Sequence, residues 1–214
     1  MSGLEHAWCD EAIMKPQRMK TFVFVVIETT SLIEDDGSLP DVIELAFLAI
    51  TRDEIKRKSQ MNGLKPRVTN SLVLCMSPEK KIKDSTRALH KIDKQDVAAF
   101  RSMDKGTCSI IRKFLKRLPK PVCLVAHNGR EFQFPILKHE FEKIQGKLPG
   151  VKLVDPLEFF RDIPEDPSCS LDALAKKYLG TQQTWNAKKD AKLLSRLVFH
   201  REFKDKFFKW ADRN

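Results

Sequence analysis

Thr21–Ile27 reads TFVFVVI, a run in which every side chain is apolar, aromatic or β-branched. A run of this length and composition, without polar alternation, is typical of a strand that is buried on both faces at the centre of a sheet. Val42–Ile50 is a second run of this kind, and Leu72–Met76 is a shorter third. The first part of the chain therefore predicts three strands, with the first of them in the interior of the sheet.

The rest of the chain predicts two more strands and several helices. Val122–Ala126 and Val151–Val154 are further short apolar runs. We expect Arg52–Asn70, which is rich in Lys and Arg, to form a loop. Strands first and helices later, with a βαβ-like centre, indicate an α/β domain. Apolar residues recur at helical spacing over residues 105–117, 134–144, 170–179, 187–199 and 201–211.

The chain has the size of one domain. Its 214 residues are 42% hydrophobic, which is enough for a full core. Residues 1–19 have no clear periodicity, so we expect a loose N-terminal arm followed by a single domain over residues 20–214. The formal net charge is +10, which favours a polyanionic partner, nucleic acid before an anionic membrane.

The cysteines and the absence of a long apolar segment bear on the compartment. The five cysteines include no CxxC pair, and Cys75 and Cys123 lie inside apolar runs, so we expect both to be buried free thiols in a reducing environment. No signal-peptide pattern is present, and no run approaches the roughly 20 apolar residues of a membrane helix. We expect a soluble intracellular protein of the nucleus or cytoplasm.

Three separated segments carry the motifs of this sequence. They are FVFVVIETT at 22–30, LVAHNGREFQFP at 124–135 and TWNAKKD at 184–190. Their order and spacing, with PDVIEL at 40–45 and SLDAL at 170–174, resemble the three-prime repair exonucleases, a branch of the DEDDh 3′–5′ exonucleases. The resemblance runs from about Thr21 to Trp210. It implies a ribonuclease H-like fold, in which helices flank a five-stranded mixed central sheet.

The resemblance also implies a chemistry that this chain lacks. The family cuts phosphodiesters with two divalent ions, held by four carboxylates beside a histidine base, and these positions correspond to Val26, Glu28, Gln133, Asp190 and Trp185. An amide coordinates Mg²⁺ far more weakly than a carboxylate, and an indole nitrogen cannot accept a proton. Because three of the five groups are replaced, we expect an inactive exonuclease-like protein without a cofactor. The alternative is an active 3′–5′ exonuclease that uses Mg²⁺ or Mn²⁺ in an unusual arrangement.

The two retained acids have open roles. We expect Glu28 and Asp190 to face one cleft, with the Trp185 indole at or near the position of the lost base. Glu28 either keeps a functional role or hydrogen-bonds a backbone group, and Asp190 either keeps one or caps a turn or pairs with a lysine. Trp185 either plugs the former site or stacks on a base.

Nucleic-acid binding is a separate expectation. By resemblance, Leu32 is an apolar wedge, and Phe132 is either a stacking or a core residue. His127 and Asn128 belong to a turn of the family that is intact here, and we expect His127 to have a structural role in it. Lys189 flanks the cleft, because Lys188 and Lys192 lie about 200° around the helix from Asp190. We expect weak, salt-sensitive binding of DNA or RNA. The lysine and arginine residues that extend this footprint are Lys56, Arg57 and Lys58.

Partners other than nucleic acid stay open. The fold could serve as a scaffold for a partner protein, and in the extreme alternative it is a protein-interaction module that binds no nucleic acid. The resemblance implies a homodimer through the edge strand at Leu72–Met76. We expect no association with a membrane.

Overall fold

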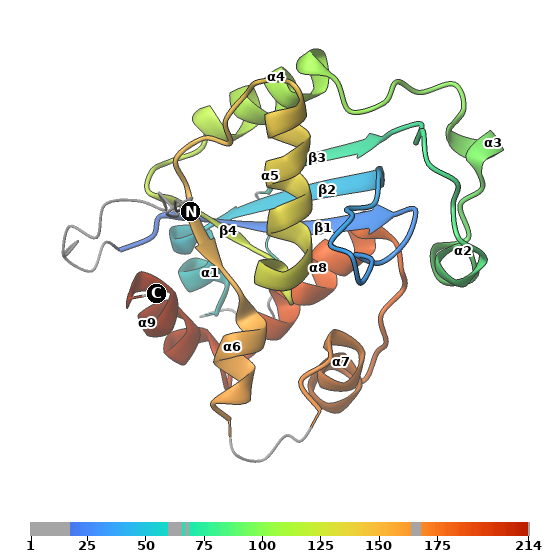
Figure 1. Cartoon of the computed structure of the whole chain (residues 1–214). Coiled ribbons are helices and arrows are strands. Elements are labelled where there is room, and N and C mark those ends of the chain that lie inside the picture. Colours follow the sequence, from blue (N-terminus) through green and yellow to red (C-terminus); the bar gives the residue numbers. More distant parts are fainter. Residues whose placement is uncertain (1–17, 60–65, 67–68, 164–167, 214) are drawn as a thin grey trace, which may run out of the picture.

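The computed structural model describes residues 18–59, 66, 69–163 and 168–213. Its centre is one five-stranded mixed sheet, as predicted, and its strand order is β3-β2-β1-β4-β5 (Figure 1). β1 is antiparallel to β2 and parallel to β4, β2 is antiparallel to β3, and β4 is parallel to β5. The strands are β1 (Thr21–Thr29), β2 (Val42–Thr51), β3 (Asn70–Cys75), β4 (Val122–Val125) and β5 (Lys152–Val154).

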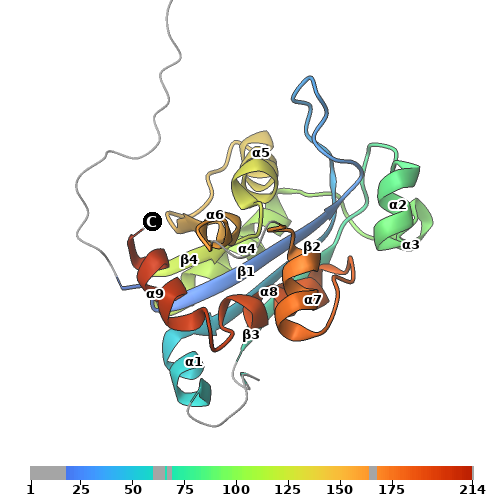
Figure 2. The ribbon, with the colours of Figure 1, turned by 90° about the horizontal axis from the view of Figure 1, so that it is seen from below.

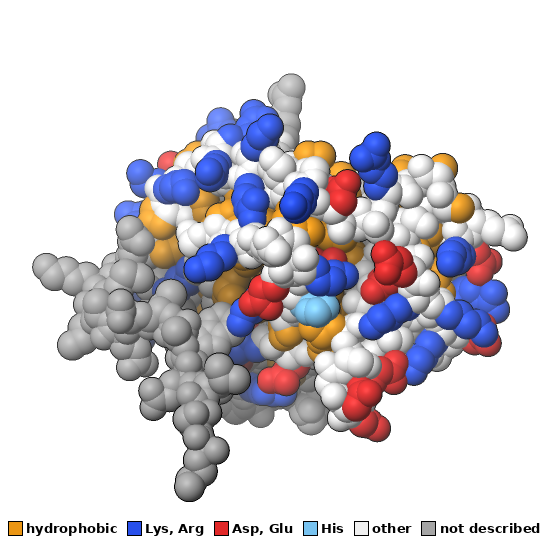
Figure 3. Space-filling view, turned by 45° about the horizontal axis from the view of Figure 1, so that its top comes forward, with side chains coloured by type: hydrophobic (Ala, Val, Ile, Leu, Met, Phe, Trp, Pro, Cys, Tyr) orange, Lys and Arg blue, Asp and Glu red, His pale blue; other side chains and the backbone are white. Residues whose placement is uncertain are grey.

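Helices cover both faces of this sheet (Figure 2). α4 (Lys105–Lys116) and α5 (Phe134–Lys143) pack on one face. The other face is covered by α6 (Pro156–Arg161), α7 (Leu171–Leu179), α8 (Ala187–Val198) and α9 (Lys204–Arg213). α2 (Asp84–His90) and α3 (Lys94–Val97) follow β3 in the chain. Lys and Arg side chains are frequent on the surface of the molecule (Figure 3). In the part of the chain that the structure describes, no helix has the length and apolar character needed to cross a membrane.

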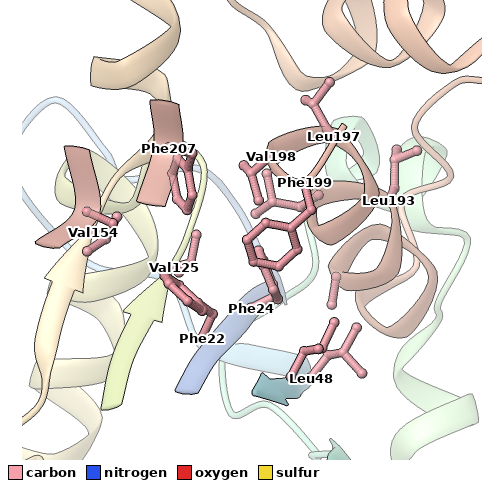
Figure 4. Packing of buried hydrophobic residues seen from close by; sticks show 14 of the residues in the cluster. Phe22, Phe24, Leu48, Val125, Val154, Leu193, Leu197, Val198, Phe199 and Phe207 are labelled. Atoms are coloured by element: carbon pink, nitrogen blue, oxygen red, sulfur yellow. The ribbon is translucent and has the colours of Figure 1, made fainter. Parts of the chain in front are cut away.

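β1 holds the two layers together. All nine of its residues are buried, as expected for the central strand. Phe22 and Phe24 point to the face covered by α8 and α9, where they meet Phe199 and Phe207 edge-on or tilted (Figure 4). Val23, Val25 and Ile27, which alternate with these residues along β1, pack against α4 and α5 on the opposite face. This alternation follows from the two-residue repeat of a strand, and it places Val26 and Glu28 toward the same face.

One expectation about the first part of the domain is wrong. Arg52–Asn70 is not a loop throughout, because α1 (Arg52–Ser59) occupies its first part. Its two anchors are the fully buried Ile55 and the buried Arg52, whose guanidinium lies over the Phe208 ring at 4.4 Å and pairs with Asp212. The sequence of α1 is mostly charged and does not show the apolar periodicity of a helix. Its packing depends on one apolar residue, Ile55, and one buried cation, Arg52.

Smaller corrections concern residues at the margins of elements. Met19 belongs to the folded domain rather than to the arm, because it is buried and its backbone N–H donates to Asp212. Residues 1–17 of the predicted arm lie outside the described residues. Cys123 is buried, as predicted, whereas Cys75 on the outer strand β3 is only half-buried. The short helices α2, α3 and α6 were not anticipated from the sequence.

Candidate nucleic-acid cleft

A cleft of about 740 Å³ lies at the carboxyl end of β1. Its size is within the usual range for small-molecule and nucleotide sites. One wall comes from the end of β1 and the loop after it, a second from α2, and a third from the short π-helix η1 (Gly129–Gln133). The last wall comes from α6, α7 and the residues before α8. The lining includes Val26, Glu28, Leu32, Leu89, His90, His127, Asn128, Phe132, Gln133, Arg161, Gln183 and Trp185.

Three carboxyl groups meet at the base of this cleft. Glu28 and Glu44 are direct partners across β1 and β2, and each is only 7% exposed. Asp190 on α8 is fully buried, and its charge acts on Glu28 together with that of Glu44. Because like charges that interact in this way repel one another, ionisation of all three carboxyl groups at once is unfavourable.

Two of the three carboxylates are held by backbone N–H groups. Glu44 Oε2 accepts from the N–H of Ala187 at 2.8 Å, at the beginning of α8, where the helix dipole favours a negative charge. Asp190 Oδ1 accepts from the N–H and hydroxyl of Thr184 at 2.9 and 2.8 Å, and its Oδ2 accepts from the N–H of Trp185 at 2.8 Å. Asp190 therefore caps the turn before α8. It does not line the cleft, which corrects the expectation that it faces the site together with Glu28.

Glu28 carries a proton instead. Burial is the largest cause that raises its pKa to about 8, and the charges of Asp190 and Glu44 raise it further. At neutral pH the side chain is therefore mainly a neutral acid, because protonation removes the unfavourable third charge from the cluster.

The replaced positions are built into the fold. Val26 joins the hydrophobic cluster beneath α8. With its amide oriented to satisfy its hydrogen bonds, Gln133 donates from its nitrogen to the backbone oxygens of Asn128 and His127 at 3.1 and 3.2 Å. An ionised carboxylate cannot make these two bonds, since it has no proton to donate. Gln133 therefore fits this turn better than the aspartate of the family motif.

Trp185 occupies an unusual backbone conformation at the rim. Its φ of 54° lies in the left-handed region, which costs roughly 1 kcal/mol or more for a bulky residue. The N–H bond to Asp190 helps to hold this conformation. The side chain lines the cleft and is 37% exposed, so an apolar ring stands beside the pocket.

A two-ion metal centre does not fit these residues. Such a centre needs several ionised carboxylates free to bind cations. Here Val26 and Gln133 supply no carboxylate, Asp190 and Glu44 bind N–H groups, and the Gln133 amide donates to carbonyl oxygens. Among the described residues, no group of three or more His, Cys, Asp or Glu side chains is arranged to hold a metal ion.

The predicted end-binding residues do converge on the cleft. Leu32 is 69% exposed at its edge, and Phe132, His127 and Asn128 line it. Phe132 is half-buried and packs against the α4–α5 core, whereas its stacking on a base stays a prediction. His127 is held by a 2.8 Å bond from its Nε2 to the carbonyl of Cys169, and burial lowers its pKa. This bond agrees with the structural role expected for His127.

The predicted basic footprint does not converge on the cleft. Lys189 is exposed on α8 and is not among the residues that line the cleft, so its place beside the cleft stays a prediction. Lys56, Arg57 and Lys58 belong to α1, which follows the end of β2 that pairs with Thr21. They lie at the opposite end of the sheet from Glu28. The position of these residues could not be inferred from their distance to the motifs in the sequence. The direction of β2 determines at which end of the sheet α1 lies.

Three contributors to the site were missed from the sequence. Glu44 was noted only as part of a framing motif, but its strand register places it opposite Glu28. Leu89 and Arg161 line the cleft from α2 and α6, two helices that were not predicted. No sequence signal marked Leu89 or Arg161, since neither lies in a recognisable motif.

Comparison with known proteins assigns the family. The model of the exonuclease family matches residues 25–198, and the chain belongs to this family. Among curated relatives, human three prime repair exonuclease 2 is 31% identical over 137 residues, 62% of this chain and 57% of the relative. Bovine three-prime repair exonuclease 1 is 33% identical over 135 residues, 59% of this chain and 42% of the relative. The chain thus spans about half the length of these relatives.

Solved structures agree with the fold. The nuclease domain of 3′hExo, a DEDDh family member bound to rAMP, has a TM-score of 0.64 at 14% identity, over 87% of this chain and 93% of that one. The complex of E. coli ExoI with single-stranded DNA has a TM-score of 0.67 at 17% identity, over 89% of this chain and 42% of that one. The α/β architecture is therefore the ribonuclease H-like fold of the DEDDh exonucleases, as the motifs predicted.

Proposed function

We propose that this chain is a catalytically inactive member of the exonuclease family that binds nucleic-acid strands without metal ions. The observation that carries the proposal is the state of the three acids. Glu28 has a pKa of about 8, and the carboxylates of Glu44 and Asp190 already accept from N–H groups. Three hydrogen bonds hold the Asp190 carboxylate in the turn before α8, and each such bond to a charged group contributes about 1.5–3 kcal/mol.

Among the described residues that line the cleft, we find no base that replaces the lost histidine. Trp185 has only a donor nitrogen. His90 lines the cleft, but its Nδ1 accepts from the N–H of Ile92 at 3.0 Å, so its remaining nitrogen carries the proton. His127 directs Nε2 to a carbonyl oxygen, which requires a proton on that atom, and its Nδ1 is buried. These contacts support the absence of a group that could deprotonate an attacking water.

Binding is supported by the surface of the cleft. Leu32, Leu89 and Trp185 are exposed by 69%, 42% and 37%, and they place apolar side chains around one pocket. A base that stacks on an aromatic ring gains about 1–3 kcal/mol regardless of its identity. Arg161 is a cation in the lining that can pair with a phosphate. Since Glu28 is neutral, it opposes the approach of a phosphate less than an ionised acid would.

The test combines a nuclease assay with a binding titration on the same protein. End-labelled single-stranded and duplex DNA and RNA are incubated with Mg²⁺ or Mn²⁺, and we expect every strand to stay intact. Binding should persist in EDTA and weaken in Trp185→Ala. Cleavage that disappears in Glu28→Ala would support the alternative, an active exonuclease. Intact strands without any binding at low salt would instead favour a scaffold for a protein partner.

A homodimer is a further part of this proposal. β3 is an edge strand of the sheet, and its residues are exposed or half-buried in the single chain. An unpaired strand edge can pair with a second copy through backbone hydrogen bonds. Sedimentation should give a dimer, and a proline in place of Val73 should shift it toward the monomer, because proline cannot donate to the ladder.

A further inference from the structure

A basic surface lies at the end of the sheet opposite the cleft. It consists of Lys113, Lys116 and Arg117 at the end of α4, Lys120 in the following loop, and Lys20 before β1. All five side chains are exposed. The two segments are in contact, because the N–H of Lys20 donates to the carbonyl of Pro121 at 2.9 Å. We call these five residues the basal surface.

The basal surface has an unbalanced positive charge. The sequence contains no Asp or Glu between residues 105 and 130. None of the five cations takes part in an ion pair with an acid that the structure describes. On a helical wheel, the buried residues Cys108, Ile111 and Leu115 face the sheet, and Lys113, Lys116 and Arg117 occupy the opposite side of α4. Figure 3 shows Lys and Arg side chains gathered over this side of the molecule.

Helix stability accounts for only part of this charge. Cations in the last turn of a helix interact favourably with its dipole, by about 0.3–1 kcal/mol each. Lys20 and Lys120 lie outside the helix, however, and gain nothing comparable. Five like charges with no acidic partner among the described residues repel one another, and the phosphates of a polyanion would relieve this repulsion.

We propose that the basal surface binds the phosphate backbone of duplex nucleic acid, independently of strand ends. Along β1, Lys20 and Glu28 are eight residues apart, which corresponds to roughly 26 Å of strand. The basal surface therefore forms a second contact region rather than an extension of the cleft. Of the exposed large hydrophobic residues among those described, only Ile110 of α4 lies next to it, one turn before Lys113. This composition fits phosphate contacts better than insertion into a membrane surface, which usually buries apolar side chains.

The test uses a covalently closed dumbbell duplex, because such a ligand offers no strand end to the cleft. The variant is Lys113→Gln/Lys116→Gln/Arg117→Gln in the full chain. The matched control is Lys188→Gln/Lys192→Gln/Arg196→Gln, which removes the same charge from exposed positions of α8. Affinity is measured across a range of salt concentrations, and circular dichroism verifies that both variants are folded.

The basal variant should lose affinity for the dumbbell by about 10- to 100-fold near 0.1 M salt. The slope of log K against log salt should fall by about 2.7, since each of the three phosphate contacts contributes about 0.9. The α8 control and Trp185→Ala should bind the dumbbell like the wild type. Equal losses in the basal and α8 variants would overturn the inference, as would binding to anionic vesicles but not to the dumbbell. Failure of dumbbell binding with retained binding of strand ends would overturn it and leave the proposed cleft function intact.

Discussion

Replacing Glu28 with glutamine should change how stability depends on pH. The pKa of Glu28 rises from 4.5, its ordinary value, to about 8 in the folded protein. The folded state therefore holds this proton more tightly than the unfolded state does. The resulting stability is fully present below about pH 4.5 and is lost as pH rises through 8.

The magnitude follows from the width of this window. One pKa unit corresponds to about 1.36 kcal/mol. Between pH 6 and pH 9 the unfolded chain has already lost this proton, whereas the folded protein loses it only near pH 8, so the Glu28 contribution to the free energy of unfolding falls by about 3 kcal/mol. Glu28→Gln keeps a neutral side chain of similar shape. The variant should therefore gain about 3 kcal/mol relative to the wild type when pH is raised from 6 to 9.

Urea denaturation at both pH values measures this difference, and other titrating groups largely cancel between variant and wild type. Glu131→Gln, at an exposed position of η1, controls for the removal of a surface carboxyl group. An unchanged difference between Glu28→Gln and wild type at pH 6 and pH 9 would refute the reasoning. So would Mg²⁺ stabilising the wild type but not the variant at neutral pH, because an ion would then occupy the place of the proton.

Three further substitutions test the surroundings of the cluster. Asp190→Asn should lower the free energy of unfolding by about 3 kcal/mol, because it removes the charge from buried hydrogen bonds and places an amide N–H against a donor such as the Trp185 N–H. A stabilised variant would mean that repulsion between the acids dominates. Trp185→Gly should not destabilise the protein, because glycine relieves a φ of 54°, but it should weaken strand binding in a fluorescence titration; unchanged binding would remove Trp185 from the proposal. Gly129→Ala should lower the thermal midpoint at a cost of about 1–3 kcal/mol, as its Cβ would lie 2.7 Å from the Phe134 ring; an unchanged midpoint would show that the turn adapts.

The fold could be predicted from the sequence because its core elements carry strong patterns. TFVFVVI at Thr21–Ile27 has no polar alternation, and the structure buries it on both faces. The apolar stripe that predicted a helix at 105–117 corresponds to α4 at Lys105–Lys116. α1 was missed because Ile55 is the only large apolar residue that it buries, and no periodicity is visible over so short a segment.

The site could be predicted only in part, because its chemistry depends on contacts between distant residues. The motifs located Glu28, Gln133 and Trp185 in one cleft. They did not reveal that Asp190 turns to the N–H groups of Thr184 and Trp185, since a carboxylate has the same sequence signature whether it binds an ion or caps a turn. The sequence also left open where Lys56, Arg57 and Lys58 lie relative to the cleft. Charge can be counted along the chain, but the end of the sheet on which it lies follows from strand direction.

Counting bound Mn²⁺ by electron paramagnetic resonance tests the central claim most directly. Wild-type protein and Glu28→Gln are titrated with Mn²⁺ at neutral pH, with and without a single-stranded oligonucleotide. If a proton and backbone N–H groups satisfy the three acids, both proteins should bind the same small amount of Mn²⁺, and the strand should bind without it. Two Mn²⁺ ions per wild-type chain that are absent from Glu28→Gln would contradict the account.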